Sequence, residues 1–312
     1  MSGGLDSQLA IRILERAGAE VEAVCFASPF FDTSIAESTA GKLGVKLRKV
    51  DFTDDIVNLI KSPAHGFGGA MNPCIDCHAL MIRRAGELME HLGYDFVATG
   101  EVQGQRPMSQ NRQALGVVEK CSGLKGRLIR PLSAQLLEPT IPELEGKLDR
   151  GKLLDISGRG RERQIALAAE LGVVDYPSPA GGCKLTEAGF ARKLRDLMAH
   201  EGLDRRYLVE LLGVARRFRL PDGTGVILGR DRGENSILRS LAHEGLTMIA
   251  PVNVPGPTAI VPEIKSEGDF ALARALVAAY SRSDRLEGNI RLNVGEEPRP
   301  YERERFKQFQ IC

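Results

Sequence analysis

The sequence has little that would place it in a membrane or outside the cell. It contains no uninterrupted apolar run of membrane-spanning length, and its N-terminus has no basic stretch followed by an apolar segment. Its six cysteines are too few for a disulfide scaffold in a chain of 312 residues. We therefore expect a cytoplasmic protein with no membrane partner, in which the spacing of the cysteines indicates metal binding or catalysis.

The sequence also lacks a strong excess of one charge. The formal net charge is +1, so an RNA partner would have to meet a local basic surface. There is no internal repeat, no low-complexity segment and no pair of histidines at metal-ligand spacing. The length predicts about two domains, each large enough to bury a core.

The first residues combine small, hydroxyl and acidic side chains. Ser2-Gly3-Gly4-Leu5-Asp6-Ser7 runs into apolar residues at helical spacing, which end at Gly18. A helix N-terminus binds phosphate, glycines allow close approach, and the two serines add donors. The alternative is that these residues only cap the helix and have no chemical role. Because a strand normally precedes such a loop, we expect either a start codon upstream of Met1 or a truncated sequence.

Strands and helices alternate in the N-terminal part. The pattern predicts strands over 21–27, 46–52 and 94–100, with helices over 33–43 and after Asp54. This alternation is typical of an α/β fold with a doubly wound parallel sheet. Ligands of such sheets bind at the carboxyl ends of the strands. We therefore expect the opening loop, Phe26, the segment near Cys74 and Thr99-Gly100 to line one crevice.

The pattern changes toward the C-terminus. Residues 104–142 have no regular pattern, and helices are predicted from about Arg159 to Leu171 and over 187–200. A hairpin follows within residues 217–230, around Pro221-Asp222-Gly223. These features predict a first domain over 1–202 and a smaller α+β domain over 203–312.

The opening loop resembles the signature of the PP-loop ATP pyrophosphatases. It lacks the Lys-Ser/Thr pair of the Walker loop. The resemblance implies an adenine nucleotide alpha hydrolase-like fold that binds the phosphates of ATP and transfers AMP to an oxygen. It implies phosphate contacts from Ser2, Gly3, Gly4, Asp6 and Ser7, a catalytic role for Asp6, and nucleotide contacts from Phe26, Thr99 and Gly100.

Three cysteines have informative positions. Cys74 and Cys77 form a Cys-x-x-Cys pair at the start of a predicted helix, where the dipole should lower the pKa of both thiols. Cys183 follows a turn stretch that ends in Gly181-Gly182 and is a third candidate. The alternatives are a thioredoxin-like redox pair or unrelated buried cysteines. Cys25, Cys121 and Cys312 are interpreted as bystanders.

Asn-Pro-Cys-x-x-Cys is similar to the active-cysteine segment of PP-loop enzymes that thiolate tRNA. In one group of these enzymes, two such cysteines and a distant third hold a [4Fe–4S] cluster. The resemblance thus implies Cys74, Cys77 and Cys183 as catalytic residues and as ligands of a cluster with one open iron. A persulfide on one cysteine, resolved by Cys183 through a disulfide, is the competing mechanism.

Arginines are concentrated around the C-terminal hairpin. Their guanidinium groups can bind RNA phosphates, although a charged run can equally be a solvated face. The segment from Arg216 to Leu238 resembles the NFACT-R module, an RNA-binding domain of ribosome-associated proteins. The predicted RNA-binding residues are Arg216, Arg217, Arg219, Arg230, Arg232 and Arg239.

Together the motifs resemble tRNA thiouridine synthases of the ThiI/2-thiouridylase kind with an NFACT-R-like domain. This implies ATP and Mg²⁺ as cofactors, adenylation of a uridine carbonyl oxygen, and sulfur transfer. The implied partners are tRNA and a sulfur donor, either sulfide or a persulfide carrier; a homodimer stays open. The alternatives are a PP-loop synthetase acting on a small molecule and a non-catalytic RNA-binding protein switched by ATP.

Overall fold

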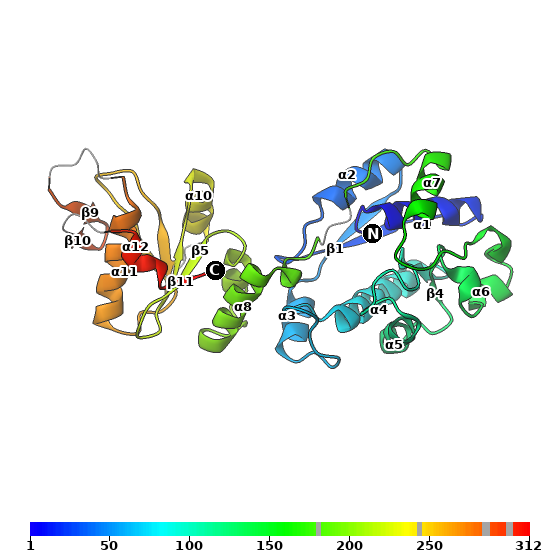
Figure 1. The fold of residues 1–312 in the computed structure, drawn as a ribbon, viewed down its shortest axis with the longest axis horizontal. Coiled ribbons are helices and arrows are strands. Elements are labelled where there is room, and N and C mark those ends of the chain that lie inside the picture. The colour runs from blue at the N-terminus through cyan, green and yellow to red at the C-terminus, as the bar shows by residue number, and fades with distance from the viewer. Residues whose placement is uncertain (179–181, 242–244, 283–287, 298–301) are drawn as a thin grey trace. The chain divides into compact units, whose positions relative to one another are not determined.

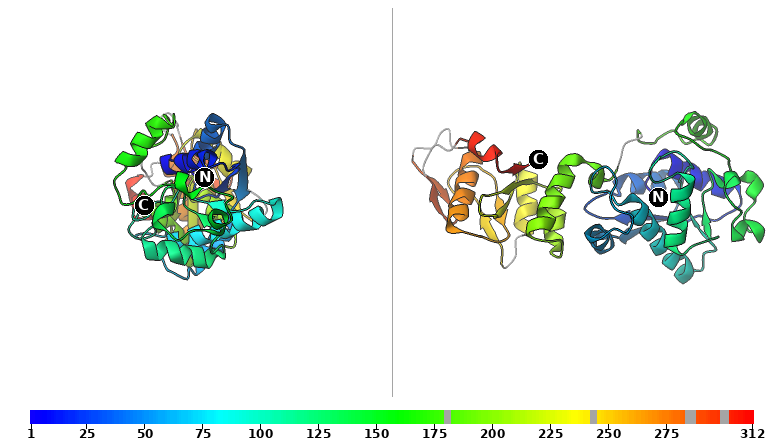
Figure 2. Two further views of the ribbon diagram at one scale, coloured as in Figure 1. Left: turned by 90° about the vertical axis from the view of Figure 1, so that its right-hand side faces the viewer. Right: turned by 60° about the horizontal axis from the view of Figure 1, so that its bottom comes forward.

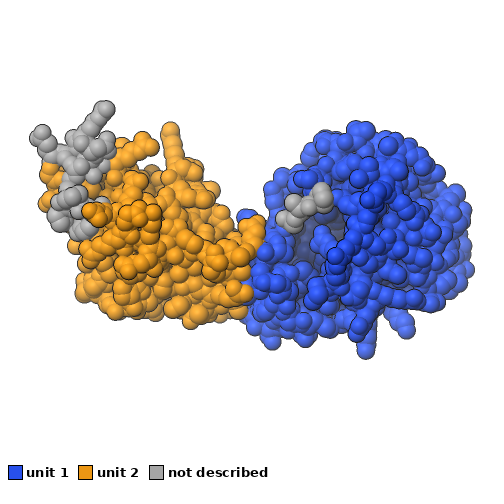
Figure 3. All heavy atoms as spheres, viewed as in Figure 1, with its two compact units in different colours: residues 1–186 blue, residues 187–312 orange. Residues whose placement is uncertain are grey.

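The computed structural model describes residues 1–178, 182–241, 245–282, 288–297 and 302–312. The chain forms two compact units, Met1–Thr186 and Glu187–Cys312 (Figure 3). The units divide earlier than the predicted boundary after residue 202. The reason is that helix α8 (Ala188–His200) packs against strand β11 (Gln310–Ile311) of the second unit.

Unit 1 follows the expected alternation of strands and helices. One prediction was wrong, because helix α5 occupies part of the segment expected to be irregular. Asn111 caps it by accepting a hydrogen bond from the Ala114 amide, and Leu115 and Val118 are buried. Its helices and strands are α1 (Leu5–Arg16), β1 (Ala23–Ala27), α2 (Ser34–Leu43), β2 (Leu47–Asp51), α3 (Thr53–Lys61), α4 (Cys74–Leu92), β3 (Val97–Ala98), α5 (Arg112–Ser122), β4 (Leu128–Ile129), α6 (Ile141–Leu144) and α7 (Glu162–Glu170), with 3-10 turns at Ala134–Leu136, Arg150–Lys152 and Lys184–Thr186.

The strands of unit 1 form two parallel pairs. Strand β1 pairs with β2, Ala23 lying opposite Leu47, and β3 pairs with β4, Val97 lying opposite Leu128. The mixed α/β fold is thus as expected, but the strands described do not join into the single doubly wound sheet that we predicted. In Figure 1, α1, α2 and α7 lie on one side of the strands and α3, α4 and α5 on the other.

No strand precedes Ser2 within the described residues. The amine of Met1 instead donates to the carbonyl of Val24 in β1. Burial lowers the pKa of this amine, an effect that the charge of Cys25 partly opposes. Leu5, Leu9 and Ile13 of α1 pack into the unit's core, which fixes the helix whose N-terminus carries the opening loop.

Unit 2 is built on an antiparallel sheet with strand order β11-β5-β6-β8-β7. The predicted hairpin is confirmed, with Arg216 opposite Leu228. Helix α11 lies on one side of the sheet, and α8 and α10 lie on the other (Figures 1 and 2). Besides α8 and β11, the elements are α9 (Arg206–Leu211), β5 (Arg216–Arg219), β6 (Gly225–Leu228), α10 (Arg232–Ser240), β7 (Thr247–Ile249), β8 (Ala259–Val261), α11 (Glu267–Tyr280), β9 (Ile290–Leu292), β10 (Gly295–Glu297) and α12 (Glu304–Lys307).

The core of unit 2 lies between the sheet and α11. Phe218, Val226 and Leu228 of the hairpin pack there with Leu276 and Phe306. Among the helices described in either unit, none combines the length and apolar character needed to cross a bilayer.

Candidate functional site

The opening loop forms the N-terminal end of helix α1. The helix begins at Leu5, one turn earlier than the apolar spacing indicated, and Gly4 precedes it. Because Gly4 has no side chain, no side-chain hydrogen bond caps the first turn. Uncapped N–H groups at the positive end of the helix dipole bind anions. The backbone at Ser2–Ser7 therefore has the geometry that a phosphate site needs.

Two glycines allow close packing at this loop. Gly3 has φ of 79°, and a Cβ atom there would lie 2.7 Å from the side chain of Ile35. A Cβ atom on Gly100 would lie 2.8 Å from the carbonyl carbon of Asp6 and 2.9 Å from the nitrogen of Ser7. Any side chain at these positions would force the backbone apart. The structure thus places the Thr99-Gly100 turn directly against the opening loop.

The two serines of the loop differ in their hydrogen bonds. The Ser7 hydroxyl donates to the carbonyl of Gly4 over 2.8 Å, so its hydrogen is used inside the loop. The Ser2 oxygen accepts from the Gly4 amide over 3.4 Å, which leaves the hydroxyl hydrogen of Ser2 to donate elsewhere. Of the two predicted hydroxyl donors, Ser2 is the one in a position to serve a ligand.

Asp6 carries a polar atom that lacks a partner. Its Oδ2 accepts a hydrogen bond from Gln105 over 3.0 Å, whereas its buried Oδ1 has no hydrogen-bond partner within the described part of the chain. A buried carboxylate oxygen without a partner is costly unless a ligand satisfies it. Carboxylate oxygen is a preferred ligand of Mg²⁺. Asp6 and the loop backbone therefore fit Mg²⁺ and the phosphates of ATP.

Phe26 lies at the carboxyl end of β1, as expected. Its ring centroid is 5.1 Å from that of Phe52, and the rings of Phe31 and Phe52 are 6.3 Å apart. These rings form an apolar cluster at the end of the strand. A contact of Phe26 with adenine stays a prediction.

Cys74 and Cys77 occupy the first turn of α4, as predicted. The helix begins at Cys74, and the Cys77 amide donates to the carbonyl of Pro73 over 2.8 Å. The Asn72 side-chain amide donates to the sulfur of Cys74 over 3.2 Å. A donor in this position stabilises negative charge on the Cys74 sulfur.

Backbone pairing brings Cys183 to the same region. Cys183 forms an antiparallel bridge with Phe31, and the Lys184 amide donates to the carbonyl of Phe30 over 2.8 Å. Two residues after Cys183, the carbonyl of Leu185 accepts from the amide of Met71, over 3.1 Å. The segment of Cys183 is thus tied to the chain just before Cys74. Gly181, part of the predicted turn, lies outside the described residues.

The predicted lowering of thiol pKa is wrong for Cys77. Burial raises the pKa of Cys77, and the neighbouring charges of Cys183, Cys74 and Asp76 raise it further. Desolvation of the thiolate therefore outweighs the helix dipole at this position.

These cysteines do not form a ready metal site. Within the ranges that the structure describes, no group of three or more His, Cys, Asp or Glu side chains is placed to hold a metal ion. The raised pKa of Cys77 also disfavours the thiolate that iron would need. The described side chains therefore do not favour the expected [4Fe–4S] cluster, and its presence is neither confirmed nor contradicted.

A buried polar chain that was not predicted lies beside this region. His78 Nδ1 is 3.0 Å from one oxygen of Glu101, and Arg130 Nε donates to the other over 3.0 Å. Burial would raise the pKa of Glu101, but the hydrogen bond and charge of His78 and the charge of Arg130 lower it to about 2. Glu101 directly follows the Thr99-Gly100 turn, so the ion pair anchors the turn that touches the opening loop.

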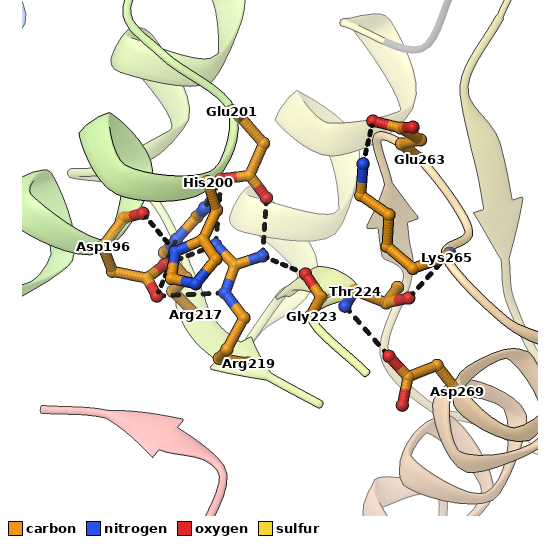
Figure 4. A network of polar contacts seen from close by, with 10 residues as sticks. All are labelled: Asp196, His200, Glu201, Arg217, Arg219, Gly223, Thr224, Glu263, Lys265 and Asp269. Atoms are coloured by element: carbon orange, nitrogen blue, oxygen red, sulfur yellow. Dashed lines mark hydrogen bonds and ion pairs between the residues drawn. The ribbon is translucent and has the colours of Figure 1, made fainter. Parts of the chain in front are cut away.

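In unit 2, Arg217 and Arg219 form a buried network and not a free basic surface (Figure 4). Both guanidinium groups bind the carboxylates of Asp196 and Glu201, and the side chain of Arg217 is only 2% exposed. Burial would raise the pKa of Asp196, but the hydrogen bonds of Arg219 and Arg217 lower it. These ion pairs remove Arg217 and Arg219 from the predicted RNA-binding set.

The other four predicted arginines gather in one cavity of unit 2. Arg216, Arg230, Arg232 and Arg239 line it, and its volume is about 780 Å³. Further lining residues, which we did not predict, come from distant segments: Tyr280, Arg282 and Arg303. Arg282 lies two residues after Tyr280. This close spacing of an aromatic and a basic residue was the one local signal in the sequence that could have indicated these lining residues.

Comparison with known proteins supports a nucleotide-binding fold in unit 1 and an RNA-binding domain in unit 2. The family model of the tRNA methyl transferase HUP domain matches residues 1–118, and that of the NFACT protein RNA binding domain matches residues 215–310. Two families therefore match, one in each unit. The first implies an α/β nucleotide-binding fold, and the second confirms the predicted NFACT-R resemblance.

Among solved structures, the chain matches the C-terminal part of the fibronectin/fibrinogen-binding protein from Streptococcus suis. The identity is 15% over 83% of this chain and 97% of that chain, with a TM-score of 0.28. No curated protein matches the sequence.

Proposed function

We propose that this chain is an ATP-dependent enzyme that thiolates a uridine of tRNA. One observation carries the proposal: the stretch of chain that runs from the end of β1 into the first turn of α2 contacts both the opening loop and the segment of Cys183. Ile35 packs on Gly3, and Phe31 pairs with Cys183. The candidate nucleotide site and a thiol are thus built on one stretch of chain. The two family matches support tRNA as the substrate.

The first step is adenylation. The uridine carbonyl oxygen attacks the α-phosphorus of ATP, the bond from that phosphorus to the bridging oxygen breaks, and pyrophosphate leaves. The uridine N3 loses its proton, which leaves the adenylated base neutral. The former carbonyl oxygen can now leave the carbon as part of AMP, which is a good leaving group. The loop amides and the Ser2 hydroxyl bind phosphate oxygens, and Asp6 would hold Mg²⁺, which neutralises phosphate charge.

Sulfur transfer follows through a persulfide on Cys74, supplied by a persulfide donor. The terminal sulfur, as an anion, attacks the activated carbon and AMP leaves. The Cys183 sulfur then attacks the Cys74 sulfur, which breaks the sulfur–sulfur bond to the uridine and forms a Cys74–Cys183 disulfide. The transferred sulfur is reduced, two thiols are oxidised, and N3 regains a proton. A dithiol reductant restores both thiols.

The choice of Cys74 rests on its surroundings. Asn72 donates a hydrogen bond to the Cys74 sulfur, whereas burial raises the pKa of Cys77 and keeps it a neutral thiol. In this mechanism Cys77 fills space and does not react. The predicted cluster would instead require all three sulfurs as ligands.

Cysteine variants test these two mechanisms. We expect Cys74→Ser and Cys183→Ser to abolish thiouridine formation with ATP, tRNA and a persulfide donor, and Cys77→Ser to keep most of it. Cys121→Ser is the matched control and should equal the parent. Equal loss in all three variants, with iron bound to the parent, would replace the persulfide mechanism by the cluster. No thiouridine from the parent protein under either condition would overturn the proposed function.

A further inference from the structure

The cavity of unit 2 collects positive charge from separate parts of the chain. Its guanidinium groups come from β5, from the residues before α10, from α10 itself, from the residues after α11 and from those before α12. The arginines that line it are Arg216, Arg230, Arg232, Arg239, Arg282 and Arg303.

Little of this charge is neutralised. Arg230 pairs with Glu234, but across the described ranges no carboxylate pairs with Arg216, Arg232 or Arg282. Asp231 also lines the cavity, yet it caps α10 by accepting a hydrogen bond from the Glu234 amide over 2.9 Å. Unpaired guanidinium groups in a concave site focus a positive potential and favour an anion of high charge density.

The cavity also has an aromatic and apolar part. The guanidinium carbons of Arg216 and Arg303 lie 4.6 Å and 5.3 Å from the ring centroid of Tyr280, so cation–π contacts hold both side chains. Pro251 and Val254 add apolar surface to the lining. A nucleotide has matching parts, because its phosphate is anionic and its base and sugar offer less polar faces.

The walls of the cavity are tightly packed. A side chain on Gly229 would collide with Asn235, and one on Gly256 would collide with Ser281. The Asn235 side chain accepts a hydrogen bond from the Thr258 amide over 2.9 Å, which links α10 to the loop that carries Gly256. The site therefore exists before ligand binds, which lowers the entropy cost of binding.

We propose that this cavity binds the phosphorylated end of an RNA strand. The inference rests on the proposed function only in taking RNA as the ligand. A terminal phosphate monoester carries about 1.5 to 2 negative charges at pH 7, against one for an internal diester. A concave site of this size admits a terminal nucleotide, whereas a continuous backbone would suit an open surface. The monoester can stand at either the 5′ or the 3′ end.

Binding of short single-stranded RNA to the full chain tests this inference. The probes are one oligonucleotide with a 5′-phosphate, with a 3′-phosphate, or with hydroxyls at both ends. We expect one phosphorylated form to bind about tenfold more tightly than the hydroxyl form, because about two charge-assisted hydrogen bonds are added. Arg232→Gln and Arg282→Gln should each remove most of that preference.

Arg206→Gln is the matched control, since Arg206 pairs with Glu210 outside the cavity lining. It should keep the preference. Equal affinity for all three RNA ends, or no RNA binding, would overturn the inference. Thiouridine formation is measured on the same parent protein: its presence without an end preference refutes the cavity assignment alone, and its absence with an end preference refutes the proposed function alone.

Discussion

Neighbouring arginines of strand β5 lie in different environments. Arg217 and Arg219 bind Asp196 and Glu201, which neutralise them, and Arg216 lies over Tyr280 at the cavity. One short strand thus carries both a structural ion network and part of a binding surface. A run of positive charge says little about binding until the partners of each residue are known.

The largest expected difference between these arginines is their contribution to the stability of unit 2. Arg217→Met leaves two buried carboxylates facing one cation, so we expect a loss of about 3–5 kcal/mol in the free energy of unfolding. Arg216→Met removes a cation–π contact and should cost about 1 kcal/mol or less. Urea denaturation measures both. Similar losses in the two variants would show that the two environments do not differ.

A second balanced network lies in unit 1. The interactions of Glu101 with His78 and Arg130 are predicted to add about 3 kcal/mol to the free energy of unfolding, because the pKa of Glu101 falls from 4.5 to about 2 on folding. A lowered carboxyl pKa stabilises the fold above pH 4.5, and this contribution is lost as the pH falls from 4.5 toward 2. Glu101→Gln should flatten the pH dependence in that range.

The exposed Glu90→Gln is the control for that measurement, since it changes the same chemical group on the surface of α4. Unfolding of unit 1 at a series of pH values gives the slope. If Glu101→Gln and Glu90→Gln give the parental slope alike, the ion pair does not act as described.

The smallest effect concerns RNA binding and salt. Arg216→Gln and Arg232→Gln should each lower the slope of log K against log salt by about 0.7–0.9 for every RNA phosphate that the variant no longer binds. Arg219→Gln should leave the slope unchanged, because its guanidinium is half-buried and already paired with Asp196 and Glu201. A lower slope for Arg219→Gln would place RNA on the α8 face instead.

Local patterns predicted much of this molecule. The strand and helix alternation, the loop at a helix N-terminus, the hairpin and the cysteine pair at the start of α4 all follow from short-range spacing. Helix α5 was missed even though Leu115 and Val118 have helical spacing and Asn111 precedes them as a cap. That signal was obscured by the charged residues around it.

What failed depended on contacts between distant segments. The pKa of Cys77 is raised first by burial in the surrounding fold and then by the charge of Cys183, far along the chain. Arg217 looked available because Asp196 and Glu201 lie on another element. No local pattern indicates such partners, so the sequence identified candidate site residues more reliably than it predicted their chemical state.

Unit 1 also has a polar group that indicates a ligand. Asp6 Oδ1 is buried and has no hydrogen-bond partner within the described residues. We interpret this as the place of a ligand, Mg²⁺ with ATP. Asp6→Asn keeps the shape of the side chain and removes its charge, and the exposed Asp95→Asn, whose partner is Lys147, is the matched control.

The most direct test of the proposed function is tRNA-dependent release of pyrophosphate from ATP, measured on the parent protein and on these two variants. We predict that Asp6→Asn slows release by about 100-fold or more, as expected when a group that stabilises developing charge is removed, and that Asp95→Asn matches the parent. A parental rate of pyrophosphate release in Asp6→Asn, or no release by the parent protein, would contradict the proposed function.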